Sequence, residues 1–89
     1  MAVGPRGELT GRIGRVVDAD GDVVPNALVA VVAAAVPMPE IGLRCDDQGR
    51  FFLRLPPGSV TLRAHSRQGN GEVEIQGQSA DEILIVVRP

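Results

Sequence analysis

Three aspartates at alternating positions are the first residues whose type and spacing could do chemistry. Asp18, Asp20 and Asp22 stand in one short segment with a glycine between the last two. Several oxygen ligands converging in one loop can hold calcium, but an EF-hand-type loop places its glycine after a third acidic residue and adds a distant glutamate. This segment does neither. We therefore expect a turn in which aspartate side chains accept hydrogen bonds from backbone amides, and the pair Asp46-Asp47 is likewise expected in a solvated turn.

The sequence contains one histidine, His65, and one cysteine, Cys45. A Cys/His pair can serve nucleophilic catalysis or contribute to a zinc site, but one residue of each type does not make a zinc site. We expect His65 to be an outward-facing strand residue and Cys45 to be a small buried or half-buried apolar side chain. The glycines mark turns and none precedes a helix, so no phosphate-binding loop is predicted. These residues predict no catalytic site, no metal and no cofactor.

Composition narrows the possible partners and the compartment. The 89 residues carry a formal net charge of −2, and the nine basic residues are all arginines spread along the chain. Nucleic-acid binding needs a concentrated basic surplus, which is absent. The single cysteine permits no intrachain disulfide, and residues 1–8 lack the apolar core of a signal peptide. The longest apolar run, 27–38, is too short to cross a membrane. We expect a cytoplasmic protein without nucleic-acid or membrane partners.

Turn signals rich in glycine, proline and asparagine divide the chain into short segments. Seven of these are predicted strands: Thr10–Asp18, Ala27–Ala35, Glu40–Cys45, Arg50–Leu55, Ser59–Ser66, Gly71–Gln76 and Glu82–Arg88. This spacing is typical of an all-β sandwich or barrel. We expect residues 1–8 to form a flexible N-terminal arm and residues 9–89 to form one domain.

Period-two alternation assigns the side chains of these strands to two faces. The predicted inward residues are Phe51, Leu53 and Leu55 in one strand and Val60, Leu62 and Ala64 in the next. The five alanines of the segment 27–36 favour a helix, but its four valines and the flanking prolines favour a strand. A tight hairpin turn is predicted at Asn70-Gly71, since both residues tolerate positive φ.

Two predicted strands are apolar on both faces. If Ala27, Val29 and Val31 point inward, then Leu28, Ala30 and Val32 point outward, and the last strand has the same character. A two-layer sandwich normally shows polar residues outside, so such a surface is either covered by the chain itself or used by a partner. The covering segment would be 36–41 or the N-terminal arm. The predicted interface residues are Leu28, Ala30, Val32 and Phe52.

The order of the segments resembles the carboxypeptidase regulatory-like domain. The residues that carry the resemblance are Gly14-Arg-Val-Val-Asp-Ala-Asp-Gly21, Val24-Pro-Asn-Ala-Leu-Val29, Asp47-Gln-Gly-Arg-Phe51 and Leu55-Pro-Pro-Gly-Ser-Val-Thr-Leu62. Asn26 stands where the family often has glycine. The resemblance implies a seven-stranded Greek-key β-sandwich of the transthyretin-like (prealbumin-like) type.

The resemblance also implies a function class. Members of the family are usually non-catalytic modules, so we expect a stand-alone interaction or assembly domain whose partner is another protein or a second copy. The alternative is a small carbohydrate- or peptide-binding module that uses the loops at one end of the sandwich. The same sandwich occurs in 5-hydroxyisourate hydrolases, which carry several histidines and a C-terminal Tyr-Arg-Gly-Ser. This chain has one histidine and ends Val-Val-Arg-Pro, so we do not expect an enzyme.

Overall fold

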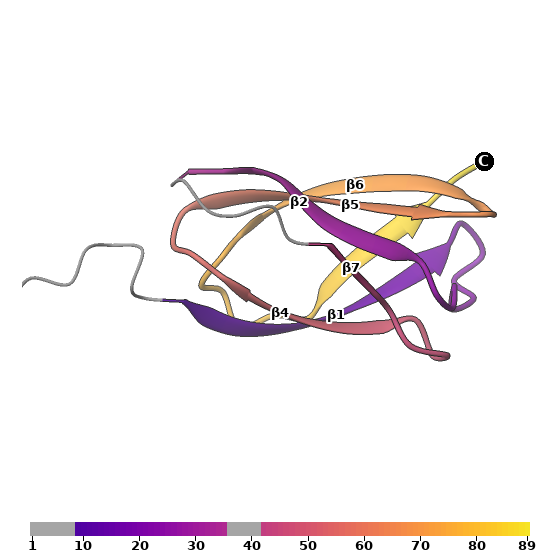
Figure 1. Cartoon of the computed structure of the whole chain (residues 1–89), viewed down its shortest axis with the longest axis horizontal. Coiled ribbons are helices and arrows are strands. Elements are labelled where there is room, and N and C mark those ends of the chain that lie inside the picture. The colour runs from indigo at the N-terminus through magenta and orange to yellow at the C-terminus, as the bar shows by residue number, and fades with distance from the viewer. Residues whose placement is uncertain (1–8, 36–41) are drawn as a thin grey trace, which may run out of the picture.

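The chain folds into seven strands and, in the part that is described, no helix. The computed structural model describes residues 9–35 and 42–89. Its strands are β1 (Thr10–Asp18), β2 (Leu28–Ala34), β3 (Gly42–Arg44), β4 (Arg50–Leu55), β5 (Ser59–Ser66), β6 (Gly69–Gln76) and β7 (Ile83–Val87) (Figure 1). The predicted strands are confirmed, including the alanine- and valine-rich one. Two predictions, the N-terminal arm and the covering segment 36–41, lie outside the described residues.

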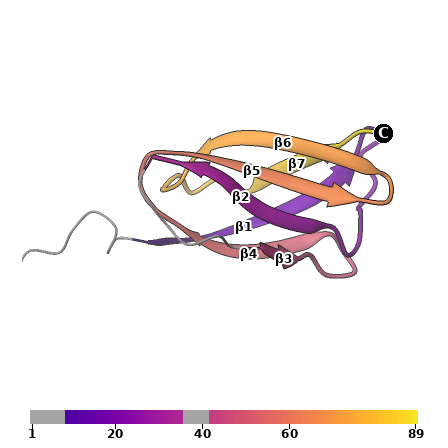
Figure 2. The ribbon, with the colours of Figure 1, turned by 45° about the horizontal axis from the view of Figure 1, so that its top comes forward.

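The strands form two sheets that face each other. The three-stranded sheet has the order β4-β1-β7 and the four-stranded sheet has the order β3-β2-β5-β6. All neighbours are antiparallel except β1 and β7, which are parallel. The two layers are visible from both viewing directions (Figures 1 and 2). This arrangement confirms the predicted seven-stranded β-sandwich.

The core is made by every second side chain of both sheets. The predicted inward residues of β4 and β5 are all buried, as are Ile83, Ile85 and Val87 of β7. The ring of Phe51 lies directly over Gly14 of β1, where a Cβ atom would stand 2.1 Å from the ring. Glycine is therefore required opposite this phenylalanine, because any side chain would displace a ring that fills the core.

Two local details differ from the predictions. The β5–β6 pairing is confirmed, but Ser66 pairs with Gly69, so the hairpin turn consists of Arg67 and Gln68 and the Asn-Gly pair lies inside β6. Gly69 has φ 136°, so one glycine at the end of the turn supplies the unusual backbone conformation. In β2, the register shifts between Val31 and Ala33. A bulge of this kind turns the following residues to the other face.

A buried arginine ties β1 to the loop between β6 and β7. Arg12 is only 4% exposed. Its guanidinium donates to the backbone carbonyls of Gln76 at 2.6 Å, Gly77 at 3.0 Å and Asp81 at 2.8 Å. No carboxylate within the described ranges forms an ion pair with it. The carbonyls of the last residue of β6 and of the following loop therefore compensate the buried charge, and the side chain fastens the two sheets at this end.

Replacing Arg12 by methionine is expected to destabilise the fold by about 3 kcal/mol. The substitution keeps the aliphatic length but leaves buried carbonyls without donors. Urea unfolding measures the change. The matched control is Arg54→Met, which removes an exposed arginine and should change the free energy of unfolding by less than about 0.5 kcal/mol. Equal effects of the two substitutions would contradict a structural role for the buried guanidinium.

Candidate functional site

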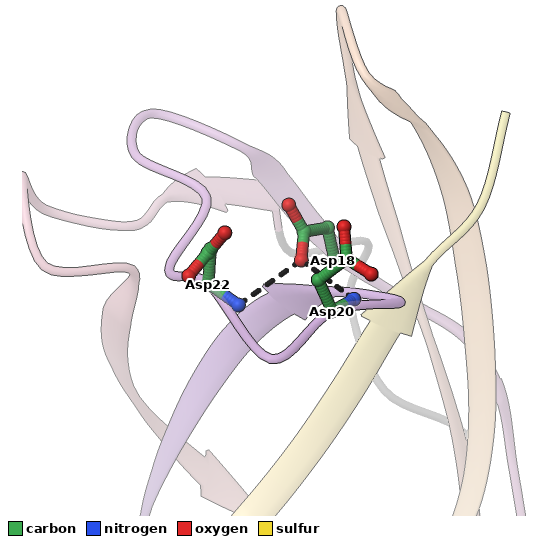
Figure 3. Close-up of side chains that lie close together, drawn as sticks. All are labelled: Asp18, Asp20 and Asp22. Carbon is green, nitrogen blue, oxygen red and sulfur yellow. Dashed lines mark hydrogen bonds between the residues drawn. The ribbon is translucent and has the colours of Figure 1, made fainter.

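The three alternating aspartates form a hydrogen-bonded turn after β1. Asp18 Oδ1 accepts hydrogen bonds from the amides of Asp20 and Asp22, at 2.9 and 3.0 Å (Figure 3). The amide of Asp18 donates to the carbonyl of Asp22, and the amide of Gly21 donates to the carbonyl of Asp18. The predicted turn role is thus confirmed for Asp18. Asp20 and Asp22 contribute backbone groups to these bonds.

The same turn occurs a second time, before β4. Asp46 Oδ1 accepts from the amides of Gln48 and Arg50, at 2.8 and 2.9 Å. The amide of Asp46 donates to the carbonyl of Arg50, and that of Gly49 donates to the carbonyl of Asp46. Each turn has a glycine three residues after its aspartate, with φ 89° at Gly21 and 74° at Gly49. The repeated spacing Asp-x-x-Gly is a signal that could have revealed this equivalence in the sequence.

The turn accounts for the acidic cluster without an ion. The carboxylates of Asp18, Asp20 and Asp22 lie within 4.8 Å of one another, and among the described residues no other His, Cys, Asp or Glu joins them. Asp20 and Asp22 are exposed, and the close approach of Asp18 follows from its bonds to their amides. The cluster is therefore interpreted as a turn.

Cys45 and His65 are not brought together. Cys45 is 3% exposed, and its Sγ donates to the carbonyl of Val24 and accepts from the amide of Ala27. His65 lies exposed on β5, where its Nδ1 contacts Asn70 Oδ1. One side chain points into the core and the other lies on the outer face, so no Cys/His site forms. Both structural predictions are confirmed.

The predicted interface residues of β2 form a narrow apolar strip on the outer face of the four-stranded sheet. Leu28 is 40% exposed and Val32 is 43% exposed, with the half-buried Ala30 between them. Polar strands lie next to the strip: Leu28 pairs with Arg44 on one side and His65 on the other. The strip is thus only one strand wide in the described part of the sheet.

At one end of this strip the surface is hollowed. A depression of about 630 Å³ is lined by Leu28, the β1–β2 connection and the β5–β6 hairpin. Its basic side chains are Arg44, His65 and Arg67, and none of the acidic side chains that the structure describes lines it. The depression therefore combines one apolar wall with a concentration of positive charge.

Phe52 does not join the strip, because it belongs to the other sheet. It lies on β4, directly opposite Ile13 of β1, on the outer face of the three-stranded sheet. Leu84 of β7 lies next along this face, opposite Arg15. Phe52 is 56%, Ile13 59% and Leu84 49% exposed, more than any residue of the β2 strip. We call the surface formed by Ile13, Phe52 and Leu84 the Phe52 face.

Arginines surround the Phe52 face. Arg15 and Arg50 are directly opposite each other across β1 and β4, and Arg54 lies opposite Gly11. Arg15 is paired with Glu82 at 3.2 Å, and Arg50 lies 3.8 Å from Asp46. Arg54 has no ion pair with any residue in the described part of the chain. The face therefore combines three exposed apolar side chains with arginines, and one of these, Arg15, lies between Arg50 and Leu84.

Sequence reasoning found Phe52 but missed Ile13 and Leu84. The signal was present in the sequence, since Ile13 alternates with the inward Arg12 and Gly14, and Leu84 alternates with buried isoleucines. The sequence did not show that these residues share one face of one sheet. Only the order β4-β1-β7 places the three apolar side chains on one face of one sheet.

Comparison with known proteins decides the family. The sequence profile of the carboxypeptidase regulatory-like domain matches residues 13–84. The chain belongs to this family. A carboxypeptidase regulatory-like domain is transthyretin-like, which agrees with the two-sheet architecture and with the predicted fold. Asn26, which stands where the family often has glycine, is the one non-glycine residue with positive φ in the described segments, at 61°. Asparagine tolerates this conformation better than most residues.

Similar curated proteins come from bacteria. The uncharacterized proteins Rv0814c and Rv3118 of Mycobacterium tuberculosis are each 40% identical to this domain over 68 residues. The match covers 75% of this chain and 66% of each relative, so the chain spans just under two thirds of their length. In the described ranges, the structure has no helix long and apolar enough to span a membrane.

Replacing Asp18 by alanine is expected to cost about 1 kcal/mol of stability, because two turn amides lose their acceptor. The matched control is Asp20→Ala, whose carboxylate accepts none of the turn's hydrogen bonds. Thermal unfolding with and without added calcium measures both effects. The turn interpretation would be contradicted if the two substitutions had equal effects or if calcium raised the melting temperature.

Acid is expected to weaken the Asp46 turn. Hydrogen bonds from the backbone amides of Arg50 and Gln48 hold the pKa of the Asp46 carboxyl below its ordinary value of 3.8. A carboxyl with a depressed folded-state pKa stabilises the fold fully above the unfolded value, and this contribution is lost as the pH falls through the folded value. Wild type should therefore lose more stability than Asp46→Asn between pH 5 and the acid limit of the native state, as measured by urea unfolding. Parallel pH profiles for the two proteins would show that the carboxylate is not held by its amides.

Proposed function

We propose that this domain is a non-catalytic module for protein interaction or assembly, and that the Phe52 face is its docking surface. The observation that carries the proposal is the exposure of three large apolar side chains on one sheet face, where Ile13 lies directly opposite Phe52 and Leu84 lies on the neighbouring strand opposite Arg15. Monomeric proteins rarely expose contiguous apolar patches of this kind unless a partner uses them.

The composition of the face supports a protein partner. Apolar and aromatic anchors surrounded by arginines are enriched at protein interfaces. Membership of a family of regulatory-like domains and similarity to uncharacterized bacterial proteins agree with a role without chemistry of its own. We also propose a cytoplasmic location, which the buried free thiol of Cys45 supports.

A second candidate function rests on the depression beside the β2 strip. Its apolar wall at Leu28 and its basic side chains suit a small ligand or peptide that carries a negative charge. The shortage of aromatic residues disfavours carbohydrate, because sugar rings usually stack on Trp or Tyr side chains, and the chain has neither.

Single charged substitutions distinguish the two surfaces. Wild type, Phe52→Glu and Leu28→Glu are immobilised and exposed to an extract of the cells that produce the chain, and the captured proteins are quantified. We expect Phe52→Glu to reduce capture by more than about tenfold, as for a residue at the centre of an interface, and Leu28→Glu to leave it unchanged. Both side chains are exposed, so the melting temperatures should stay close to wild type.

The controls give each result a clear meaning. Light scattering at micromolar concentration shows whether the captured partner is a second copy. Unchanged capture by Phe52→Glu would refute the Phe52 face as the docking surface. Loss of capture by Leu28→Glu alone would transfer the function to the β2 strip and its depression.

A further inference from the structure

Among the described strands, none pairs with the edge of β4 that lies beside the Phe52 face. Strand β4 is the last strand of the sheet β4-β1-β7, and its hydrogen-bonded neighbour is β1. The amide of Val16 donates to the carbonyl of Gly49 at 2.8 Å, which sets the alternation of the antiparallel ladder. By that alternation residues 51, 53 and 55 bond to β1, while Phe52 and Arg54 direct their N–H and C=O groups away from it. No backbone hydrogen bond from the rest of the described chain reaches these two residues.

The free segment of this edge is short. At its start, the amide of Arg50 donates to Asp46 Oδ1, and its carbonyl accepts from the amide of Asp46. After its end stands Pro56, which has no N–H to offer. The edge therefore offers the two donors and two acceptors of Phe52 and Arg54.

Strand β6, an edge strand of the other sheet, has partners at its two ends. Asn70 of β6 exchanges two backbone hydrogen bonds with Arg88, at 3.0 and 2.9 Å. At the other end of β6, the carbonyl of Gln76 accepts from Arg12. Unpaired strand edges are sites of strand addition, and proteins usually block them. In the described ranges both edges are blocked at their ends and keep two residues between them, and they differ in the outward side chains, which are acidic at Glu72 and Glu74 of β6 and basic at Arg50 and Arg54 of β4.

The side chains above the free edge define what can bind there. Arg50, Phe52 and Arg54 alternate on the outer face of β4. A strand added to this edge would place its own outward side chains about 5 Å from them. Acidic residues opposite Arg50 and Arg54, with an apolar residue between them opposite Phe52, would match this pattern in charge and in polarity.

The geometry points to an extended segment of a partner protein that adds to β4 as a strand and whose outward residues run acidic, apolar, acidic. This inference rests on the proposed function and specifies how the Phe52 face is occupied. Main-chain hydrogen bonds to Phe52 and Arg54 supply affinity, and the alternating side chains supply specificity.

The β4 strand of a second copy is a poorer occupant of this edge. If β4 pairs antiparallel with its own copy about Phe52, then Arg50 stands directly opposite Arg54. If the pairing is centred on Arg54, the two Arg54 side chains face each other. If it is centred on Leu53, each Arg54 lies opposite Phe52 of the other copy, and the two Arg54 side chains are diagonal neighbours. Like charges that face each other across two strands destabilise the pair. An acidic segment turns each of these repulsions into an attraction.

A pair of synthetic peptides tests the inference on the intact chain. The probe has the core Glu-Thr-Val-Thr-Glu with capped ends, and the control has Lys-Thr-Val-Thr-Lys. We expect the glutamate peptide to bind and to slow amide hydrogen exchange at Phe52 and Arg54, but not at Leu53, as followed by NMR. Equal binding of the lysine peptide, or binding without protection of those two amides, would overturn the proposal.

Variants of Arg54 separate the contribution of its side-chain charge to peptide binding from the contribution of its backbone N–H. Arg54→Gln should weaken binding of the glutamate peptide about three- to fivefold. Arg54→Pro should weaken it about fivefold further, because it removes the edge N–H, and proline is tolerated on an edge strand. Arg54→Glu should improve binding of the lysine peptide. Equal affinities of the glutamine and proline variants would overturn strand addition.

The result also separates this inference from the function on which it rests. If the glutamate peptide fails to bind while Phe52→Glu still abolishes partner capture, the acidic strand is refuted and the docking face stands. If the amides of Phe52 and Arg54 are protected without peptide, and more so at higher protein concentration, the occupant is a second copy and the inference is overturned.

Discussion

Burial of every second side chain between two sheets is the constraint on which the rest of this structure depends. Fifteen buried hydrophobic residues of the ranges 9–35 and 42–89 make the core, and phenylalanine is its only aromatic type. A core of small aliphatic side chains tolerates no slip in register, since a shift by one residue would turn an entire apolar set to solvent. The inward set therefore determines the outward set, and the outward residues of β1, β4 and β7 are the ones left free to serve a partner.

Polar groups secure the ends of the sandwich where the strand ladders stop. Arg12 supplies donors to three carbonyls at the end of β6 and in the β6–β7 loop, and Asp18 and Asp46 supply acceptors to the amides of two equivalent turns. The turn at Asp46 also occupies the backbone groups of Arg50. It thereby limits the free edge of β4 to Phe52 and Arg54. The turn at one end of the strand thus sets the length of the proposed docking edge.

The sequence predicted what depends on local alternation and turn chemistry. The strands, the inward residues of β4 and β5, the buried Cys45 and the exposed His65 all follow from patterns within a few residues. It did not predict which outward residues become neighbours. Phe52 was grouped with Leu28 although the two lie on different sheets, because strand order depends on contacts between residues far apart in the chain. Arg12 was not recognised as a core residue, because its partners are carbonyls more than 60 positions away.

The two outer faces differ in how their charges are used. On the four-stranded sheet, Arg63 is bonded to Glu72 and Ser59 to Glu74, so the polar side chains next to the β2 strip satisfy one another. On the three-stranded sheet, Arg15 and Arg50 face each other and have exposed acidic partners, while Arg54 has no ion-pair partner among the described residues. An exposed ion pair contributes little to stability, so an incoming carboxylate can replace it at small cost. The arginines of the Phe52 face are thus available to a partner, whereas Arg63 and Glu72 beside the β2 strip are already committed to each other.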